Sequence, residues 1–171
     1  MGANEQGANA TDNRWLTIPR SLCFVFNGND VLLMKRGAQR RIFPNQYNGL
    51  GGHIERDEDP LSAAKREILE ESGLSVHDIR LRSVHNIDAG EKTGIMLFVY
   101  TAQSDNRDFI DTGEEGSLHW IPIDKLTDYD LVEDLPLILP RLLETGATTQ
   151  LYSVHVTYDK NDEIQMRFVV D

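Results

Sequence analysis

The sequence predicts an α/β or α+β protein in which strands and two helices pack as a sandwich. Three observations indicate this fold class. Many apolar residues fall in short runs, or alternate with polar residues, as they do along strands. Two longer segments carry helix start and stop signals. The end of the chain alternates around a short polar turn, as a β-hairpin does.

The predicted strands are short and are separated by turn sequences. The turn Asn-Gly-Asn-Asp at residues 27–30 separates the first two strands, and Asp-Ala-Gly-Glu-Lys-Thr-Gly separates a later pair. The closing hairpin turns at Asp-Lys-Asn-Asp. The predicted strands cover residues 20–26, 31–34, 79–87, 94–102, 118–121, 152–158 and 164–168.

The first predicted helix runs from about residue 59 to residue 73. Pro60 suits a first helical turn, and Gly73 suits a C-terminal cap. Negative charge near its N-terminus agrees with the helix dipole; these residues are Asp57, Glu58 and Asp59. Its expected apolar stripe consists of Leu61, Ala64 and Ile68.

The second predicted helix covers residues 134–144 and is strongly apolar. Pro136 and Pro140 oppose this assignment, because proline removes a backbone donor and crowds the preceding turn.

Charge and cysteine content exclude several classes of protein. The net charge of −11, from 17 basic and 28 acidic residues, argues against binding to duplex nucleic acid, where positive charge supplies the affinity. No apolar stretch is long enough to cross a bilayer, and the N-terminus lacks the basic start and apolar core of a secretory signal. The single cysteine, Cys23, permits no intrachain disulfide. We therefore expect a cytoplasmic protein without a membrane partner.

The domain organisation is expected to be simple. Residues 1–16 are small and polar, which predicts a disordered lead. Residues 17–171 are expected to form a single domain, because no repeat or long linker divides them. The sequence leaves open whether the protein is a monomer or a homodimer.

Three glutamates on the first predicted helix form a candidate metal site. Glu67, Glu70 and Glu71 are spaced i, i+3, i+4, so their side chains should converge on one helix face. Like charges at this spacing oppose an isolated helix, and a bound cation would remove that cost. Mg²⁺ prefers such oxygen ligands. An acidic run of this kind is more often a solvated helix face, so the surrounding residues decide between the two readings.

The surrounding segment resembles the Nudix box, Gly-x5-Glu-x7-Arg-Glu-U-x-Glu-Glu-x-Gly-U, where U is a bulky apolar residue. Every fixed position is filled at the right spacing, by Gly52, Glu58, Arg66, Glu67, Ile68, Glu70, Glu71, Gly73 and Leu74. The resemblance implies the Nudix fold, a mixed β-sheet sandwiched between α-helices. It also implies hydrolysis of a nucleoside diphosphate linked to another moiety, with Mg²⁺ as the cofactor and Mn²⁺ as a substitute.

The same resemblance implies roles for the box residues. The metal ligands would be Glu67, Glu70 and Glu71, with Glu71 as the first choice, and a backbone carbonyl near Gly52 would join them. The remaining charged pair of the catalytic group, Glu58 and Arg66, would give structural or electrostatic support.

Outside the box, the chain is similar to the MutT-like branch that acts on 8-oxo-dGTP. The stretches VLLMKRG, YNGLGGHIE and HWIPIDKL carry this similarity. Two absences agree with it: no proline occurs between Pro60 and Pro122, and no tyrosine between Tyr47 and Tyr100. Relatives that cleave ADP-ribose or dinucleoside polyphosphates usually carry one of these residues there. The similarity implies a small-molecule nucleotide substrate, most plausibly an oxidised purine nucleoside triphosphate.

Four residues carry over from this branch. Glu115, with Glu114 as its competitor, stands where related enzymes place one more metal-binding or basic carboxylate. Asn48 stands where an amide reads the purine base, but it could instead serve the turn before Gly49. Glu133 and Asp134 fall near acidic residues that contact the edge of the base in this branch, although Asp134 could simply cap the helix that follows.

The loop before the box supplies the other substrate-binding candidates. Lys35 and the backbone at Gly51 could approach phosphates, Tyr47 stands where an aromatic residue is expected, and Phe43 could stack on a base or anchor the loop. Residues 37–46 form a longer loop than in the relatives. Its arginines, Arg40 and Arg41, could contact phosphates or be solvated.

The expected reaction is substitution at phosphorus by a metal-activated water, with Glu70 or Glu115 as the general base. Other Nudix substrates remain as alternatives: a dinucleoside polyphosphate, a capped RNA end or a nucleotide sugar. A non-catalytic Nudix ligand-binding module is the non-enzymatic alternative, although such modules tend to lose box glutamates.

Overall fold

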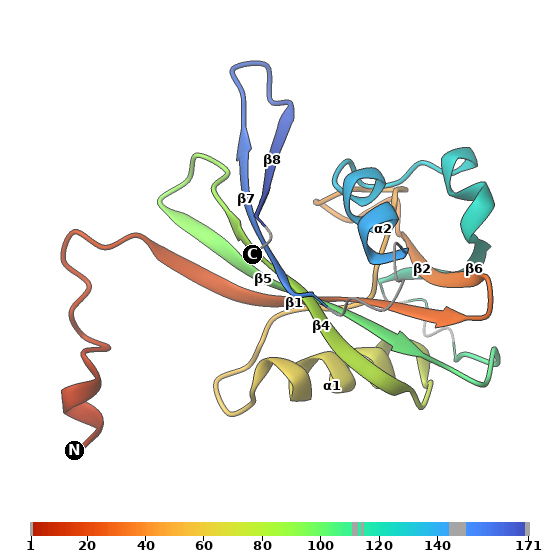
Figure 1. Cartoon of the computed structure of the whole chain (residues 1–171), viewed down its shortest axis with the longest axis horizontal. Helices are drawn as coiled ribbons and strands as arrows, with labels where there is room; N and C mark the ends of the chain where they lie inside the picture. Colours follow the sequence, from red (N-terminus) through yellow and green to blue (C-terminus); the bar gives the residue numbers. More distant parts are fainter. Residues whose placement is uncertain (1, 111–112, 114, 144–149, 170–171) are drawn as a thin grey trace.

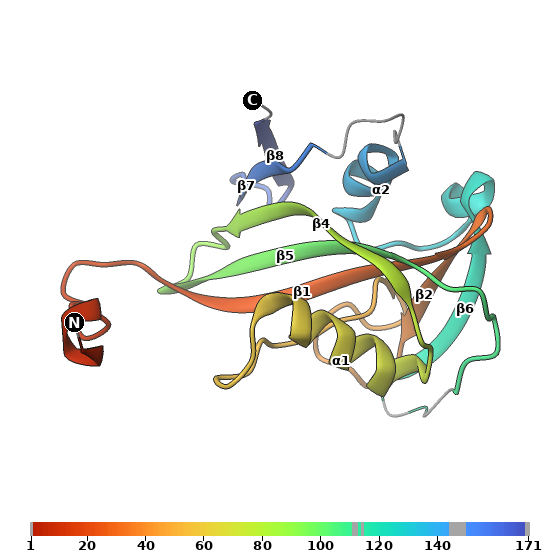
Figure 2. The ribbon, with the colours of Figure 1, turned by 60° about the horizontal axis from the view of Figure 1, so that its bottom comes forward.

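The computed structural model describes residues 2–110, 113, 115–143 and 150–169. Within them, one mixed sheet is covered on one face by α1 and on the other by α2 (Figures 1 and 2). This confirms the predicted fold class. The elements are η1 (Ala3–Gln6), β1 (Leu16–Asn27), β2 (Asp30–Arg36), β3 (Tyr47–Asn48), α1 (Pro60–Ser72), β4 (His77–Ile87), β5 (Thr93–Gln103), β6 (Gly116–Pro122), η2 (Ile123–Asp128), α2 (Leu135–Leu143), β7 (Tyr152–Tyr158) and β8 (Ile164–Val169).

The sheet has the strand order β3-β2-β1-β5-β4-β7-β8 among the described residues, and β6 also pairs with β2. β1 pairs in parallel with β5, from Leu16 opposite Thr93 to Phe26 opposite Gln103. β1 is exposed in its first half and buried from Ser21 to Phe26, because only the second half lies between the two helical layers. The buried residues form two clusters, one on each face of the sheet.

Helix α1 begins and ends as its sequence predicts. The Asp59 carboxylate caps the helix by accepting hydrogen bonds from the backbone N–H groups of Leu61 and Ser62. Gly73 takes the left-handed conformation, with φ of 68°, and its N–H donates to Leu69. The expected apolar stripe is wrong in one residue: Ala64 and Ile68 are buried, but Leu61 is 39% exposed. It lies at the margin of the buried face rather than within it.

Other element boundaries differ from the predictions. β1 starts four residues earlier than expected, and β3 and η2 were not predicted at all. α2 forms despite Pro140, which lies inside it; residue 144, the expected end of this helix, lies outside the described residues. The closing hairpin is confirmed as β7 and β8.

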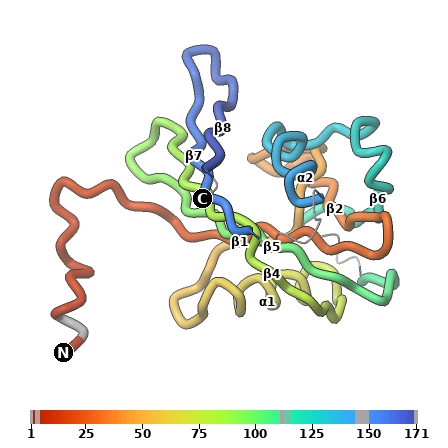
Figure 3. The backbone as a smooth tube through the Cα atoms, in the orientation of Figure 1, coloured from red at the N-terminus to blue at the C-terminus, as the bar shows by residue number. Residues whose placement is uncertain are grey.

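The N-terminal residues extend away from the sheet (Figure 3). η1 lies inside the stretch expected to be disordered, and β1 begins at Leu16. The ring of Trp15 covers Gly94 of β5 so closely that a Cβ at Gly94 would overlap it. The division between a lead and a single domain at residue 16 stays a prediction. No helix in the described part of the chain is long and apolar enough to span a membrane.

Residues 49–54 run along β1 and set the position of α1. Cys23 and Leu50 exchange backbone hydrogen bonds of 2.7 and 3.0 Å, and the N–H of Ser21 donates to the carbonyl of Gly52 at 2.9 Å. Gly51 has a φ of 138°, and any Cβ there would overlap the Ser21 carbonyl. Only glycine therefore lets this loop lie so close to the strand.

Candidate active site

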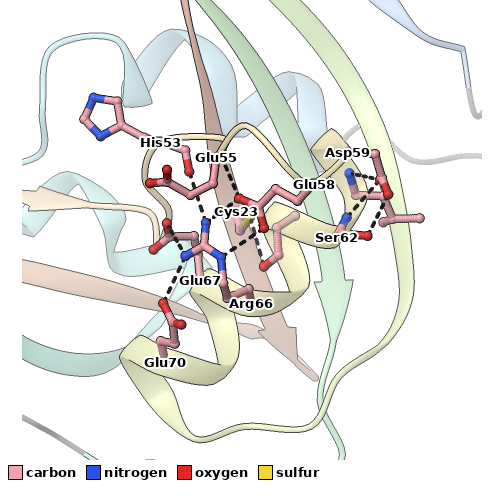
Figure 4. A network of polar contacts seen from close by, with 11 residues as sticks. Cys23, His53, Glu55, Glu58, Asp59, Ser62, Arg66, Glu67 and Glu70 are labelled. Carbon is pink, nitrogen blue, oxygen red and sulfur yellow. Dashed lines mark hydrogen bonds and ion pairs between the residues drawn. The ribbon is translucent and has the colours of Figure 1, made fainter.

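Arg66 is the centre of the charged network on α1 (Figure 4). Its guanidinium donates to both carboxylate oxygens of Glu58, at 2.6 and 3.0 Å. It also donates to Glu67 at 2.9 Å, to Glu70 at 3.0 Å and to the carbonyl of His53 at 3.1 Å. The Glu70 contact joins two residues one helical turn apart, at i and i+4. These hydrogen bonds raise the pKa of Arg66 and lower the pKa of Glu58, so both groups keep their charges.

Glu67 lies where α1 meets the glycine loop. A Cβ placed on Gly52 would lie 2.8 Å from the Glu67 carboxyl carbon, so the missing side chain makes room for this carboxylate. Burial raises the pKa of Glu67, and its hydrogen bond with Arg66 opposes that rise. The carbonyl of Gly52 accepts the Ser21 N–H, which leaves one lone pair for another partner.

Glu71 points to the loop instead of to Arg66. Its carboxylate accepts a hydrogen bond from the N–H of Gly51 at 2.9 Å. Burial raises the pKa of Glu71 to about 8, and the carboxylates of Glu67 and Glu115 add to the rise. The charge of Arg36 opposes it. Arg36 was not singled out from the sequence, although its place next to Lys35 at the end of a strand is a signal that could have drawn attention to it.

The three glutamates of the candidate metal site have different hydrogen-bond partners in this structure. Arg66 holds Glu67 and Glu70, and Gly51 holds Glu71. In this arrangement no three His, Cys, Asp or Glu side chains among the described residues are close enough to hold a metal ion. The donor set nevertheless suits a divalent cation, since burial and mutual repulsion disfavour the charged forms of Glu67 and Glu71 and a cation would reverse that preference.

Glu115 is the additional carboxylate expected near the box. It accepts a 2.9 Å hydrogen bond from Arg40, and its charge raises the pKa of both Glu67 and Glu71. The structure therefore brings Glu115 into the electrostatic field of the box. Its competitor, Glu114, lies outside the described residues.

Tyr47, the aromatic residue expected before the box, belongs to a second group of residues, together with Lys35, His119 and Tyr129. The ring of Tyr47 makes edge contacts with His119 and Tyr129, at centroid distances of 5.5 and 5.2 Å. The Lys35 ammonium lies 5.8 Å from the centroid of the Tyr47 ring. His119 had no role assigned from the sequence, and only the β2–β6 pairing brings it to Tyr47.

The acidic pair Glu133–Asp134 adjoins Tyr47 through the backbone. The N–H of Val132 donates to the carbonyl of Tyr47 at 3.0 Å, so the two expected base-contacting stretches are brought together. Burial raises the pKa of Asp134 to about 6, and the carboxylate of Glu133 adds to this. One carboxylate oxygen of Asp134 is buried without a hydrogen-bond partner in the described structure.

Tyr158, at the end of β7, is a neighbour of this pair that sequence reasoning missed. Burial raises the pKa of Tyr158, and the charges of Glu133 and Asp134 and a hydrogen bond with Glu133 add to the rise. The alternation of the hairpin predicted which face Tyr158 would take. It did not predict which loop that face would meet.

Two expected substrate contacts have plainer surroundings. The side-chain oxygen of Asn48 accepts the N–H of Gly49 at 2.8 Å, which is the turn role considered for it. Phe43 is 37% exposed with a φ of 51°. It belongs to neither core cluster of the described residues, so the structure does not support the idea that it anchors its loop.

Fold and site together define an α+β protein with a glutamate-rich helix that faces a glycine loop. A family model for the NUDIX domain matches residues 16–142. The chain is 32% identical over 129 residues to the oxidized purine nucleoside triphosphate hydrolase of Mus musculus, covering 72% of this chain and 78% of the mouse protein. The chain belongs to the Nudix family.

Two further comparisons define how far this similarity extends. The structure of a MutT protein from Bacillus halodurans superposes with a TM-score of 0.73 at 22% identity, covering 88% of this chain and 97% of that one. The m7GpppN-mRNA hydrolase NUDT17 of Danio rerio is 48% identical over 46 residues, which are 27% of this chain and 15% of the zebrafish protein. The expected enzyme class, a Nudix hydrolase, is confirmed by the family match.

Proposed function

We propose that the chain is a Mg²⁺-dependent pyrophosphohydrolase that converts purine nucleoside triphosphates, 8-oxo-dGTP among them, to the monophosphate and pyrophosphate. The observation that carries this proposal is the complete set of box glutamates, held between Arg66 and the backbone of the Gly51–Gly52 loop. The similarity to the mouse oxidized purine nucleoside triphosphate hydrolase supports the substrate class.

The residues proposed to hold Mg²⁺, or Mn²⁺ in its place, are Glu67, Glu70, Glu71, Glu115 and the carbonyl of Gly52. A bound ion of this kind neutralises phosphate charge and makes a water more acidic. Such ions keep substrate phosphates in their coordination shell, which explains how a chain of net charge −11 attracts a polyphosphate.

The surrounding protein groups position these carboxylates. Arg66 is fixed by its two contacts to Glu58, so it presents a rigid donor to Glu67 and Glu70. Glu70 is 59% exposed, which lets its carboxylate reach a water and accept a proton. Glu115, whose charge raises the pKa of Glu67 and Glu71, is the other candidate for the general base.

The base is proposed to bind near Tyr47, Glu133 and Asp134. Asp134 offers a buried carboxyl oxygen without a partner, and such an oxygen gains most from a hydrogen bond supplied by a ligand. A purine presents N–H donors and ring acceptors along its edge. The amide nitrogen of Asn48 can donate while its oxygen serves the turn, so the two proposed roles of Asn48 are compatible.

The decisive experiment measures pyrophosphate and phosphate release with Mg²⁺ over a nucleotide panel that includes 8-oxo-dGTP, dGTP, dCTP and ADP-ribose. We expect pyrophosphate as the inorganic product, with 8-oxo-dGTP or dGTP as the best substrates. Glu70→Gln should be inactive, while Glu55→Gln, an exposed neighbour outside the Arg66 contacts, should match the wild type. Release of phosphate alone, or equal rates for all nucleotides, would refute the proposal.

A capped RNA end is the second candidate substrate, because the zebrafish m7GpppN-mRNA hydrolase shares a stretch of 46 residues with this chain. That stretch is short compared with the similarity to the mouse triphosphatase. Including a capped dinucleotide in the panel separates the two substrates directly.

A further inference from the structure

The ion pair between Arg40 and Glu115 joins the two loops that flank the box carboxylates. The guanidinium of Arg40 donates to Glu115 at 2.9 Å, and both side chains are 39% exposed. The same loops are tied through the backbone, since the N–H of Gly37 donates to the carbonyl of Glu115 at 3.0 Å. The backbone of Glu115 is therefore fixed independently of its side-chain partner.

We infer that Arg40 is a phosphate-binding residue that is stored on Glu115 and exchanges that carboxylate for the polyphosphate when the metal and substrate bind. This inference rests on the proposed function, which places Glu115 among the metal ligands. Each side chain of the pair has a second possible partner: the metal for Glu115 and the polyphosphate for Arg40. Without metal and substrate, the two side chains bind each other.

Exposure makes the pair exchangeable. An ion pair between two solvent-exposed side chains contributes little free energy, because water screens it and two long side chains must be ordered. A divalent cation bound beside Glu115 repels a guanidinium at hydrogen-bond distance from the same carboxylate. Arg66 is retained beside its carboxylates by its two contacts to Glu58, but Arg40 is held by the exposed pair and is displaced from it. The hydrogen bond between Gly37 and Glu115 keeps both loop backbones in place.

Phosphate is the partner that suits the released guanidinium. Arginine matches phosphate oxygens with two parallel N–H donors, and a polyphosphate held by a metal at Glu115 would lie beside the carboxylate that Arg40 leaves. The first turn of the loop keeps Arg40 close, because its N–H donates to the carbonyl of Gly37 at 3.0 Å. The long loop, residues 37–46, thus supplies a positive group to an otherwise acidic site.

The first test measures binding of Mn²⁺ alone, by the loss of the free-ion electron paramagnetic resonance signal. Arg40→Gln should bind Mn²⁺ about two- to fivefold more tightly, the range expected when an exposed ion pair no longer competes. Arg41→Gln is the matched control, because it removes the same charge from the next residue, which is exposed. In a Glu115→Gln background, Arg40→Gln should change Mn²⁺ affinity no more than Arg41→Gln does.

The second test measures binding of inorganic tripolyphosphate by calorimetry in the presence of saturating Mn²⁺. Arg40→Gln should weaken this binding about fivefold or more, the scale of one lost charge-assisted hydrogen bond, and Arg41→Gln less than twofold. Equal effects of the two variants in either test would overturn the inference. A wild-type protein that hydrolyses no nucleotide would refute the proposed function, and these two binding measurements would still decide the exchange.

Discussion

The two acidic regions of the protein differ in how their charge is balanced. On α1, one arginine serves Glu58, Glu67 and Glu70. At the start of α2, Asp134 has no cation partner among the described residues, and one of its oxygens is buried without a hydrogen bond. The acidic side chains of the box are therefore satisfied by protein groups, whereas one buried oxygen of Asp134 is not.

Among the variants that test this comparison, the substitution of Glu71 should have the largest effect. Glu71→Gln should reduce kcat at least about a thousandfold, comparable with the loss of a group that acts in the transition state. Its metal-free form should be more stable at pH 8, on the order of 4 kcal/mol, because burial raises the pKa of Glu71 from 4.5 to about 8 and the charged form is disfavoured. Steady-state kinetics and chemical denaturation of the metal-free protein measure the two effects.

The pH dependence of this variant provides its control. Since the folded pKa lies above the unfolded one, the wild type loses stability as pH rises from about 4.5 to about 8. The advantage of Glu71→Gln should therefore vanish at pH 4. A stability difference that is the same at pH 4 and pH 8 would contradict the burial argument.

Substitution of Arg66 tests all of its contacts with Glu58, Glu67 and Glu70 at once. Arg66→Met should lower the free energy of unfolding by about 2 kcal/mol, because it leaves Glu58 and Glu67 partly buried without a counter-charge. Urea denaturation at pH 7 measures the loss, with Arg41→Met as the matched surface control. If both variants unfold at the same urea concentration, the network does not stabilise the fold.

Asp134 tests the unbalanced region. Asp134→Asn should leave kcat for dGTP within about threefold but reduce discrimination between purine and pyrimidine triphosphates about tenfold, the scale of one specific hydrogen bond. Its stability should exceed that of the wild type above pH 6, on the order of 3 kcal/mol, since the pKa of Asp134 is raised from 3.8 to about 6.

Below pH 4 the stability gain from Asp134→Asn should disappear, because both forms are then uncharged there. If Asp134 only caps α2, the variant keeps its discrimination, and the ratio of kcat/KM values for dGTP and dCTP decides between the two roles.

Tyr158 gives the smallest expected effect. Tyr158→Phe removes one hydroxyl from Glu133 and should change the free energy of unfolding by less than about 1 kcal/mol. The ratio of kcat/KM values for 8-oxo-dGTP and dGTP should shift about two- to threefold if Glu133 reads the base. Tyr129→Phe, at a residue whose ring contacts Tyr47, is a control for the loss of an aromatic hydroxyl.

The box could be predicted from sequence because its residues are close together along the chain. Helix spacing places Arg66 beside Glu70, and the capping residues Asp59 and Gly73 set the helix ends. Spacing alone did not predict that Arg66 would bind Glu67 and Glu70 but not Glu71. When a side chain can reach several acceptors, their positions in three dimensions decide which of them it binds. The metal site expected from these glutamates stays a prediction.

The second region was harder to predict because it is assembled from distant segments. Tyr47, His119 and Tyr158 come from three parts of the chain: Tyr47 contacts His119 and the segment before Asp134, and Tyr158 contacts Glu133. The order of the strands and the position of α2 over the sheet decide which of these segments meet. No local pattern encodes that order. The prediction that Leu61 would be buried was wrong for a related reason. Periodicity gives the direction of a side chain, but it does not give the width of the surface against which the helix packs.

The pairing of β1 has a consequence for biosynthesis. On one edge, β1 binds the loop at residues 49–54, which leaves the ribosome soon after it; on the other, it waits for β5, which is made much later. Long-range parallel pairing is slow to form, so a nascent chain can assemble the glycine loop and α1 while the other edge of β1 is still uncovered. Unpaired strand edges invite association between chains. Early contact with a chaperone would therefore matter most between the synthesis of α1 and that of β5.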